Sequence, residues 1–121
     1  MNKRETGTAG EKLACDFLHR NGYDIVETNY RCPEGEIDIV ARQGDTLVFV
    51  EVRTKTGRGF GLPEESITPV KMARLRTVAA RYGESHFDLP EAWRIDIIAI
   101  EMDRKGRPWR IELIENAVNG G

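Results

Sequence analysis

Two carboxylic acids lie inside apolar segments that a short polar turn joins. Asp38 stands within the segment Ile-Asp-Ile-Val at 37–40, and Glu51 stands within Phe-Val-Glu-Val at 49–52. An ionised carboxylate is costly to bury without a partner, so both positions need a reason. A divalent cation is one such reason, because Mg²⁺ prefers hard oxygen ligands and is commonly held by one or two carboxylates together with water and phosphate.

A cation follows the second acid at close spacing. Arg53 lies two residues after Glu51, on the same face of an extended strand. Two acids and a cation at one rim suit phosphodiester hydrolysis, in which a metal activates water and positive charge stabilises the phosphate oxygens. In the structural alternative, Asp38 and Glu51 are half-exposed and pair with arginines such as Arg42 or Arg53. The spacing alone leaves both interpretations open.

Hydrophobic periodicity predicts the elements that carry these residues. Segment 46–54 is apolar on both faces, which is typical of a central strand covered on both sides. The order α-β-β-β-α-β-β predicts an α/β fold with a mixed sheet and helices packed on it. The expected helices are 7–20 and a second that begins at Thr68-Pro69 and ends at Gly83, and the expected strands are 23–30, 36–42, 46–54, 93–101 and 108–115.

Composition narrows the class of protein. The 121 residues are 40% hydrophobic and 31% charged, with a net charge of −2, which predicts a single domain over 1–121 with its own core. The two cysteines, Cys15 and Cys32, form at most one bridge. No apolar run approaches the roughly 20 residues of a membrane helix, and the N-terminus has no secretory signal. We therefore expect a cytoplasmic protein without a membrane partner.

Positive charge is concentrated in the middle of the chain. Residues 53–81 hold seven basic residues and two acidic ones, whereas the flanking segments are acidic. Such a segment fits a nucleic-acid backbone, or it is a solvated helix face.

Several short motifs resemble a known family. The segments Gly35–Ala41 and Leu47–Arg53 resemble the core of the PD-(D/E)XK nucleases. They are more closely similar to the YraN family, a bacterial group related to Holliday-junction resolvases. The similarity continues at Gly7–Ala14, Ser66–Lys71 and Arg94–Ile100, so it covers nearly the whole chain.

The resemblance implies a restriction-endonuclease-like fold and a metal-dependent nuclease. Mg²⁺ or Mn²⁺ would be held by Asp38 and Glu51, with the Val52 carbonyl as a further ligand and Glu11 as a helper from the first helix. The implied substrate is DNA, with branched or damaged DNA as candidates. Because resolvase-like proteins often use two active sites, the resemblance also implies a homodimer.

One position departs from the nuclease pattern. The usual lysine of the last motif is Arg53 here, and an arginine clamps phosphate but stays charged, so it cannot act as the base. Lys55 or Lys71 would then supply an ammonium group, and Lys55 is the better candidate for a plain surface residue. The alternative function is a non-catalytic module that binds nucleic acid or protein; the arginine and the net charge favour it, and the retained acids oppose it.

Asp96 and the two tryptophans are expected to have structural roles. Asp96 is expected to pair with Arg94 or to cap the sheet. Trp93 and Trp109 begin strands that should face each other, which predicts a cross-strand aromatic pair or a cap on the core.

Overall fold

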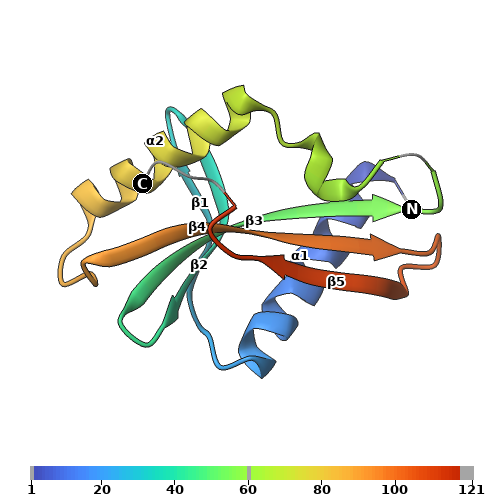
Figure 1. The fold of residues 1–121 in the computed structure, drawn as a ribbon, viewed down its shortest axis with the longest axis horizontal. Coiled ribbons are helices and arrows are strands. Elements are labelled where there is room, and N and C mark those ends of the chain that lie inside the picture. Colours follow the sequence, from blue (N-terminus) through green and yellow to red (C-terminus); the bar gives the residue numbers. More distant parts are fainter. Residues whose placement is uncertain (1, 60, 118–121) are drawn as a thin grey trace.

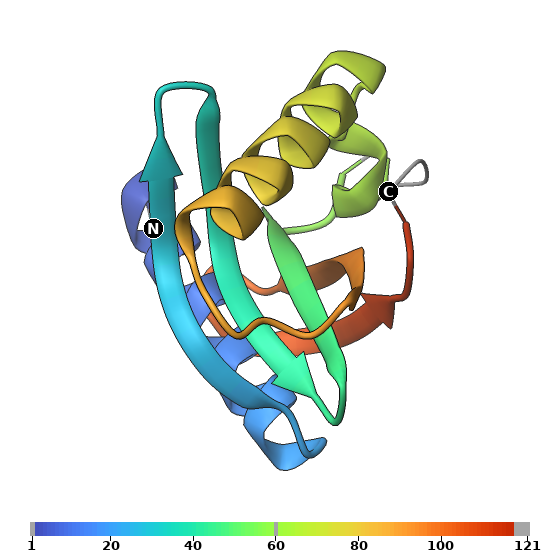
Figure 2. The same ribbon diagram turned by 90° about the vertical axis from the view of Figure 1, so that its left-hand side faces the viewer.

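A computed structural model describes residues 2–59 and 61–117 of the chain. Five strands form one sheet, and two helices lie on its opposite faces (Figures 1 and 2). The observed order confirms the predicted α-β-β-β-α-β-β arrangement. In chain order the elements are α1 (Lys3–Arg20), β1 (Asp24–Cys32), β2 (Gly35–Gln43), β3 (Thr46–Thr56), a 3-10 helix η1 (Pro63–Ser66), α2 (Pro69–Ser85), β4 (Ala92–Met102) and β5 (Pro108–Ile114).

The strand predicted to be central is central. The sheet order is β1-β2-β3-β4-β5; β3 pairs antiparallel with β2 and parallel with β4. Val48 and Val50 on one face of β3 join the core cluster under α1, and Leu47 and Phe49 on the other face join the cluster under α2. Both faces are therefore covered, as the two-sided apolar pattern indicated.

Both helices are longer than predicted. α1 begins at Lys3 rather than at residue 7, because the side chain of Asn2 caps it by accepting a hydrogen bond from the Glu5 N–H at 2.8 Å. α2 has the predicted cap at Thr68 but continues past Gly83 to Ser85, since one exposed glycine costs a helix only about 1 kcal/mol. No helix within the described residues is long and apolar enough to cross a membrane.

A glycine lets α1 lie directly against the central strand. Gly10 is buried, and a Cβ atom at this position would overlap the Oγ1 atom of Thr54 in β3. The first turns of α1 are thereby held at the carboxyl end of β3, where Thr6 and Thr56 are linked through their hydroxyl groups at 3.3 Å.

The predicted tryptophan pair is wrong. β4 and β5 are antiparallel, so their first residues lie at opposite ends of the ladder. Trp93 packs edge-on against Phe49 with ring centres 5.9 Å apart, and Trp109 lies under the guanidinium of Arg58 at 5.0 Å. Trp93 thus borders the core, as the alternative interpretation expected.

Candidate active site

β2 and β3 separate at the two acids that the sequence singled out. The ladder between these strands runs from the turn to the pair Ile39–Val50 and ends there. Beyond that point β2 continues to pair with β1, and β3 continues to pair with β4. Asp38 and Glu51 are the next residues along the two strands, so they lie in the fork between them.

Asp38 bridges the fork. Its Oδ2 atom accepts a hydrogen bond from the Val52 N–H at 2.8 Å, in place of a ladder bond between the two strands. A carboxylate that caps a backbone amide in this way is fixed in orientation. The carboxylate of Asp38 can therefore accept further bonds in the same fork that holds Glu51.

Glu51 is the most perturbed acid of the site. Its side chain is 14% exposed and forms an ion pair with Arg53, with 3.0 Å between Oε2 and Nη2. Burial raises the pKa of Glu51 to about 8; a hydrogen bond with Asp38 and the charge of Asp38 act in the same direction, while Arg53 and Lys71 oppose them. Glu51 therefore binds a proton more readily than an ordinary glutamate does, and a cation placed beside it would compete with that proton.

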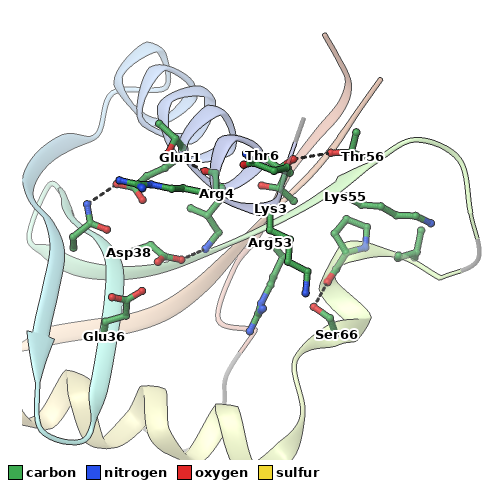
Figure 3. A pocket seen from close by; sticks show the side chains of 18 of the residues that line it. Lys3, Arg4, Thr6, Glu11, Glu36, Asp38, Arg53, Lys55, Thr56 and Ser66 are labelled. Atoms are coloured by element: carbon green, nitrogen blue, oxygen red, sulfur yellow. Dashed lines mark hydrogen bonds between the residues drawn. The ribbon is translucent and has the colours of Figure 1, made fainter. Parts of the chain in front are cut away.

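Two cavities open onto the fork. One of about 350 Å³ lies on the side of α2, and one of about 950 Å³ lies on the side of α1. Figure 3 shows the larger one, with Asp38 and Arg53 on its floor and the first turns of α1 along one side. The smaller cavity is lined by Gly35, Glu36, Asp38, Glu51, Val52, Arg53, Lys71, Arg74 and Leu75.

The two candidate lysines differ in their surroundings. Lys71, in the first turn of α2, borders the same cavity as both acids, and its charge favours the ionised form of Glu51. Lys55 instead donates from Nζ to the carbonyl oxygens of Gly59 and Gly61, at 2.7 and 2.6 Å, so it fastens the loop after β3 rather than standing in solvent. Lys71 is thus the lysine that the fold brings to the acids.

Glu11 lies at the edge of this arrangement. Its Oε1 atom accepts a hydrogen bond from the Asn29 side chain at 2.8 Å. Glu11 lines the larger cavity together with Asp38, but the smaller cavity that contains Glu51 does not include it. The fold therefore gathers Asp38, Glu51, Val52, Arg53 and Lys71, and leaves Glu11 on the wall.

The donor set fits a magnesium ion but is minimal. Within residues 2–59 and 61–117 no group of three or more histidine, cysteine, aspartate or glutamate side chains is arranged to hold a metal. Two carboxylates are nevertheless enough for Mg²⁺, which keeps several water ligands. Asp38 and Glu51 supply these carboxylates in mutual contact.

The basic segment 53–81 does not form one surface, because the fold separates its residues. Lys71 and Arg74 border the cavity beside the acids. Arg81 forms an ion pair with Glu34 at 2.9 Å, away from that cavity. Lys71 and Arg74 lie near the start of α2, whereas Arg81 lies near its end, so their position along the helix is what separates them.

Comparison with known proteins assigns the chain to a family. The model described as "Uncharacterised protein family UPF0102" matches residues 10–100. A UPF0102 protein of Dehalococcoides mccartyi is 49% identical over 117 residues, which cover 97% of this chain and 95% of the relative. UPF0102 proteins of Moorella thermoacetica and Roseiflexus castenholzii are 45% and 47% identical, with 97% and 98% of this chain and 98% of each relative covered. The chain therefore belongs to the UPF0102 family, which is the YraN family that its sequence motifs resemble.

Proposed function

We propose that this protein is a metal-dependent nuclease that hydrolyses phosphodiester bonds in DNA, with branched or damaged DNA among its substrates. The observation that carries the proposal is the contact between Asp38 and Glu51 in a strand fork that opens onto two cavities. A buried acid with a pKa near 8, next to a second acid, is typical of functional sites.

The proposed cofactor is Mg²⁺ or Mn²⁺, held by the carboxylates of Asp38 and Glu51 and by the carbonyl of Val52. When bound, such an ion supplies a water of lowered pKa and positive charge for the phosphate. To bind the ion, Glu51 must give up its proton where it carries one, and must exchange its contact with Arg53 for the metal. Metal affinity should therefore rise with pH up to about 8, the pKa of Glu51.

Arg53 is proposed to bind the phosphate that is cleaved. Its Nε atom is buried and has no hydrogen-bond partner among the described residues, so the fold leaves part of this guanidinium unsatisfied. A guanidinium released from Glu51 would hold phosphate oxygens with two parallel hydrogen bonds. Arg53 stays protonated throughout, so any proton transfer falls to another group.

Lys71 and Glu11 are proposed to assist from the two walls. Lys71 lines the cavity that contains both acids, where its ammonium would hold a phosphate oxygen or orient the attacking water. Glu11 would act from the opposite wall, where it is bonded to Asn29. We assign Glu11 the weaker effect, since it does not reach the cavity of Glu51.

A second candidate function is a binding module that keeps the fold without cleavage. The ion pair between Arg53 and Glu51 favours it. Nη2 of Arg53 lies 3.0 Å from Oε2 of Glu51, so the arginine can compensate the charge of the acid without a metal. In that case Arg53 would contribute to binding alone. A homodimer and a cytoplasmic setting accompany either function as predictions from the sequence.

Cleavage assays decide between the two functions. Labelled duplex, single-stranded, flap and four-way DNA, and RNA, would be incubated with Mg²⁺ or Mn²⁺ at pH 8. We expect wild-type protein to cut at least one DNA form, and Asp38→Asn and Glu51→Gln to lose this activity. Glu36→Gln is the matched control, because Glu36 borders the same cavities but pairs with Arg31 at the surface. A wild-type protein that binds nucleic acid and cuts none of these forms would be the non-catalytic module.

A further inference from the structure

The two cavities beside the acids adjoin at the strand fork, and together they are called the groove below. Both are lined by Glu36, Asp38, Val52 and Arg53. The smaller cavity extends from this junction toward α2, and the larger one extends along the first turns of α1 (Figure 3). A chain-like ligand can therefore pass over the acids and leave on both sides.

Basic residues line this groove on both sides of the acids, and Glu11 is an acid among those at the α1 end. Lys71 and Arg74 line its α2 end, and Lys3 and Arg4 line its α1 end. Lys3 and Arg4 are both exposed. The acids lie between these basic ends. This pattern suits a polyanion whose central phosphate meets a cation held by the acids, while neighbouring phosphates meet the basic ends.

Helix stability does not explain the two cations on α1. Lys3 and Arg4 occupy the first turn, where positive charge opposes the helix dipole, and Glu5 is the only acid in that turn. Arg53 adds a separate indication at the junction, where its buried Nε lacks a partner among the described residues. The groove thus carries donors on both sides of the acids that folding alone does not require.

The lining of the groove indicates which part of a nucleic acid it contacts. No aromatic side chain among the described residues lines either cavity, so this part of the lining offers no ring on which bases would stack. The α1 end instead offers hydroxyl groups beside the cations. These come from Thr6, Thr8, Thr54, Thr56 and Ser66. Hydroxyl and cationic groups bind phosphate and sugar, which fixes the position of a strand but carries no sequence information.

We infer that one nucleic-acid strand crosses the groove from α2 to α1, and that Lys3 and Arg4 form a phosphate-binding subsite on the α1 side of the cleavage point. The inference rests on the proposed function, since it takes the acids as the point of cleavage. The subsite recognises the phosphodiester backbone independently of base sequence.

Binding measured without divalent ions tests this subsite. Labelled single-stranded and duplex DNA, and single-stranded RNA, of mixed sequence would be titrated in EDTA at several salt concentrations. The test variant is the double substitution Lys3→Ala with Arg4→Ala. The matched control is Lys12→Ala with Arg20→Ala, which removes the same charge from the same helix but outside the groove lining.

We expect the test variant to lower the slope of log affinity against log salt by about 1.4 on a single strand, or about 1.8 on a duplex, with no change in sequence preference. The control should keep the wild-type slope. The ligand with the larger affinity loss identifies the strand form that occupies the subsite.

Equal losses in the test and control variants would show a general charge effect and overturn the subsite, as would wild-type affinity in the test variant. Because cleavage plays no part in this assay, the two proposals fail separately. Groove-dependent binding without any cleavage contradicts only the nuclease. Cleavage by a protein whose binding ignores Lys3 and Arg4 contradicts only the subsite.

Discussion

Buried acids occur at two places in this sheet, and their surroundings differ. On β4, Asp96 is fully buried; Arg94 donates to both of its oxygens at 3.1 and 3.0 Å, and the Asn116 N–H donates at 2.8 Å. Burial raises the pKa of Asp96 and also that of Glu51. After burial, the largest influences on the pKa of Asp96 are hydrogen bonds from Asn116 and Arg94, which stabilise its charge. For Glu51 the largest influences after burial come from Asp38, and they oppose ionisation. The protein thus balances the charge of Asp96 with its own groups, whereas Glu51 in the fork can still bind a proton or a cation.

The arginines of the two regions follow the same division. Arg110 on β5 binds Glu101 at 3.2 Å and Glu64 at 2.7 Å, which fastens η1 to the sheet. Arg94 likewise ties the start of β4 to neighbouring groups, including the Tyr23 hydroxyl at 3.0 Å. Arg53 at the fork contacts Glu51 but leaves its buried Nε without a partner among the described residues. The first two arginines complete the fold, and the third has bonding capacity left for a ligand.

The largest expected effect lies on the structural side of this comparison. Arg94→Ala should destabilise the protein by roughly 3–5 kcal/mol, because it leaves Asp96 buried without its cation. Urea unfolding measures this loss. Arg107→Ala is the matched control and should change stability little, since its ion pair with Asp103 is exposed. A stable Arg94→Ala protein would remove the contrast between the two regions.

The second effect concerns Arg53 and is seen in activity. If wild-type protein cleaves DNA, Arg53→Ala should lower kcat by about 10²–10³-fold, the loss typical of one transition-state donor. Arg53→Lys should retain or increase cleavage, because it restores the usual lysine of the nuclease pattern. Single-turnover cleavage with Mn²⁺ measures the rate of each variant relative to wild type. Full activity in Arg53→Ala together with inactivity in Lys71→Ala would place the working cation on α2.

The third effect is the pH dependence of stability. The raised pKa of Glu51 means that the folded state binds a proton more tightly than the unfolded state. The stability that this site contributes is therefore complete at low pH and declines as the pH rises from about 4.5 to about 8. Glu51→Gln should remove this decline, since the amide mimics the protonated acid.

Unfolding in urea at pH 5, 6.5 and 8 checks this prediction. The stability advantage of Glu51→Gln over wild type should grow across the series, and Glu36→Gln reports the effect of removing an exposed carboxylate from the same groove. A constant difference between Glu51→Gln and wild type would contradict the raised pKa of Glu51.

Local sequence patterns predicted the parts of the fold that depend on neighbouring residues. The short turn at Gly44 and the alternation of apolar residues together set the register of β2 and β3. The sequence therefore predicted that Asp38 lies near Glu51. The pattern could not show that the ladder ends at Ile39 and Val50, because that depends on β1 continuing to pair with β2. The fork is therefore a tertiary feature.

The α1 side of the groove was hidden in the sequence for a similar reason. Lys3 and Arg4 reach the site only because Gly10 lets α1 lie on Thr54 of β3. No local pattern encodes that contact between distant segments. The wrong tryptophan pair has a different cause, since it assumed that antiparallel strands align at their first residues.

Titration of Mn²⁺ into the protein tests the central claim most directly. Calorimetry at pH 8 should show a single ion bound to wild-type protein, with proton release that increases as the pH is lowered toward 7. Asp38→Asn and Glu51→Gln should each abolish binding while remaining folded, and Glu36→Gln should bind as wild type does. Unchanged affinity in both site variants, or no binding by wild-type protein at millimolar Mn²⁺, would show that the acids of the fork do not form a metal site.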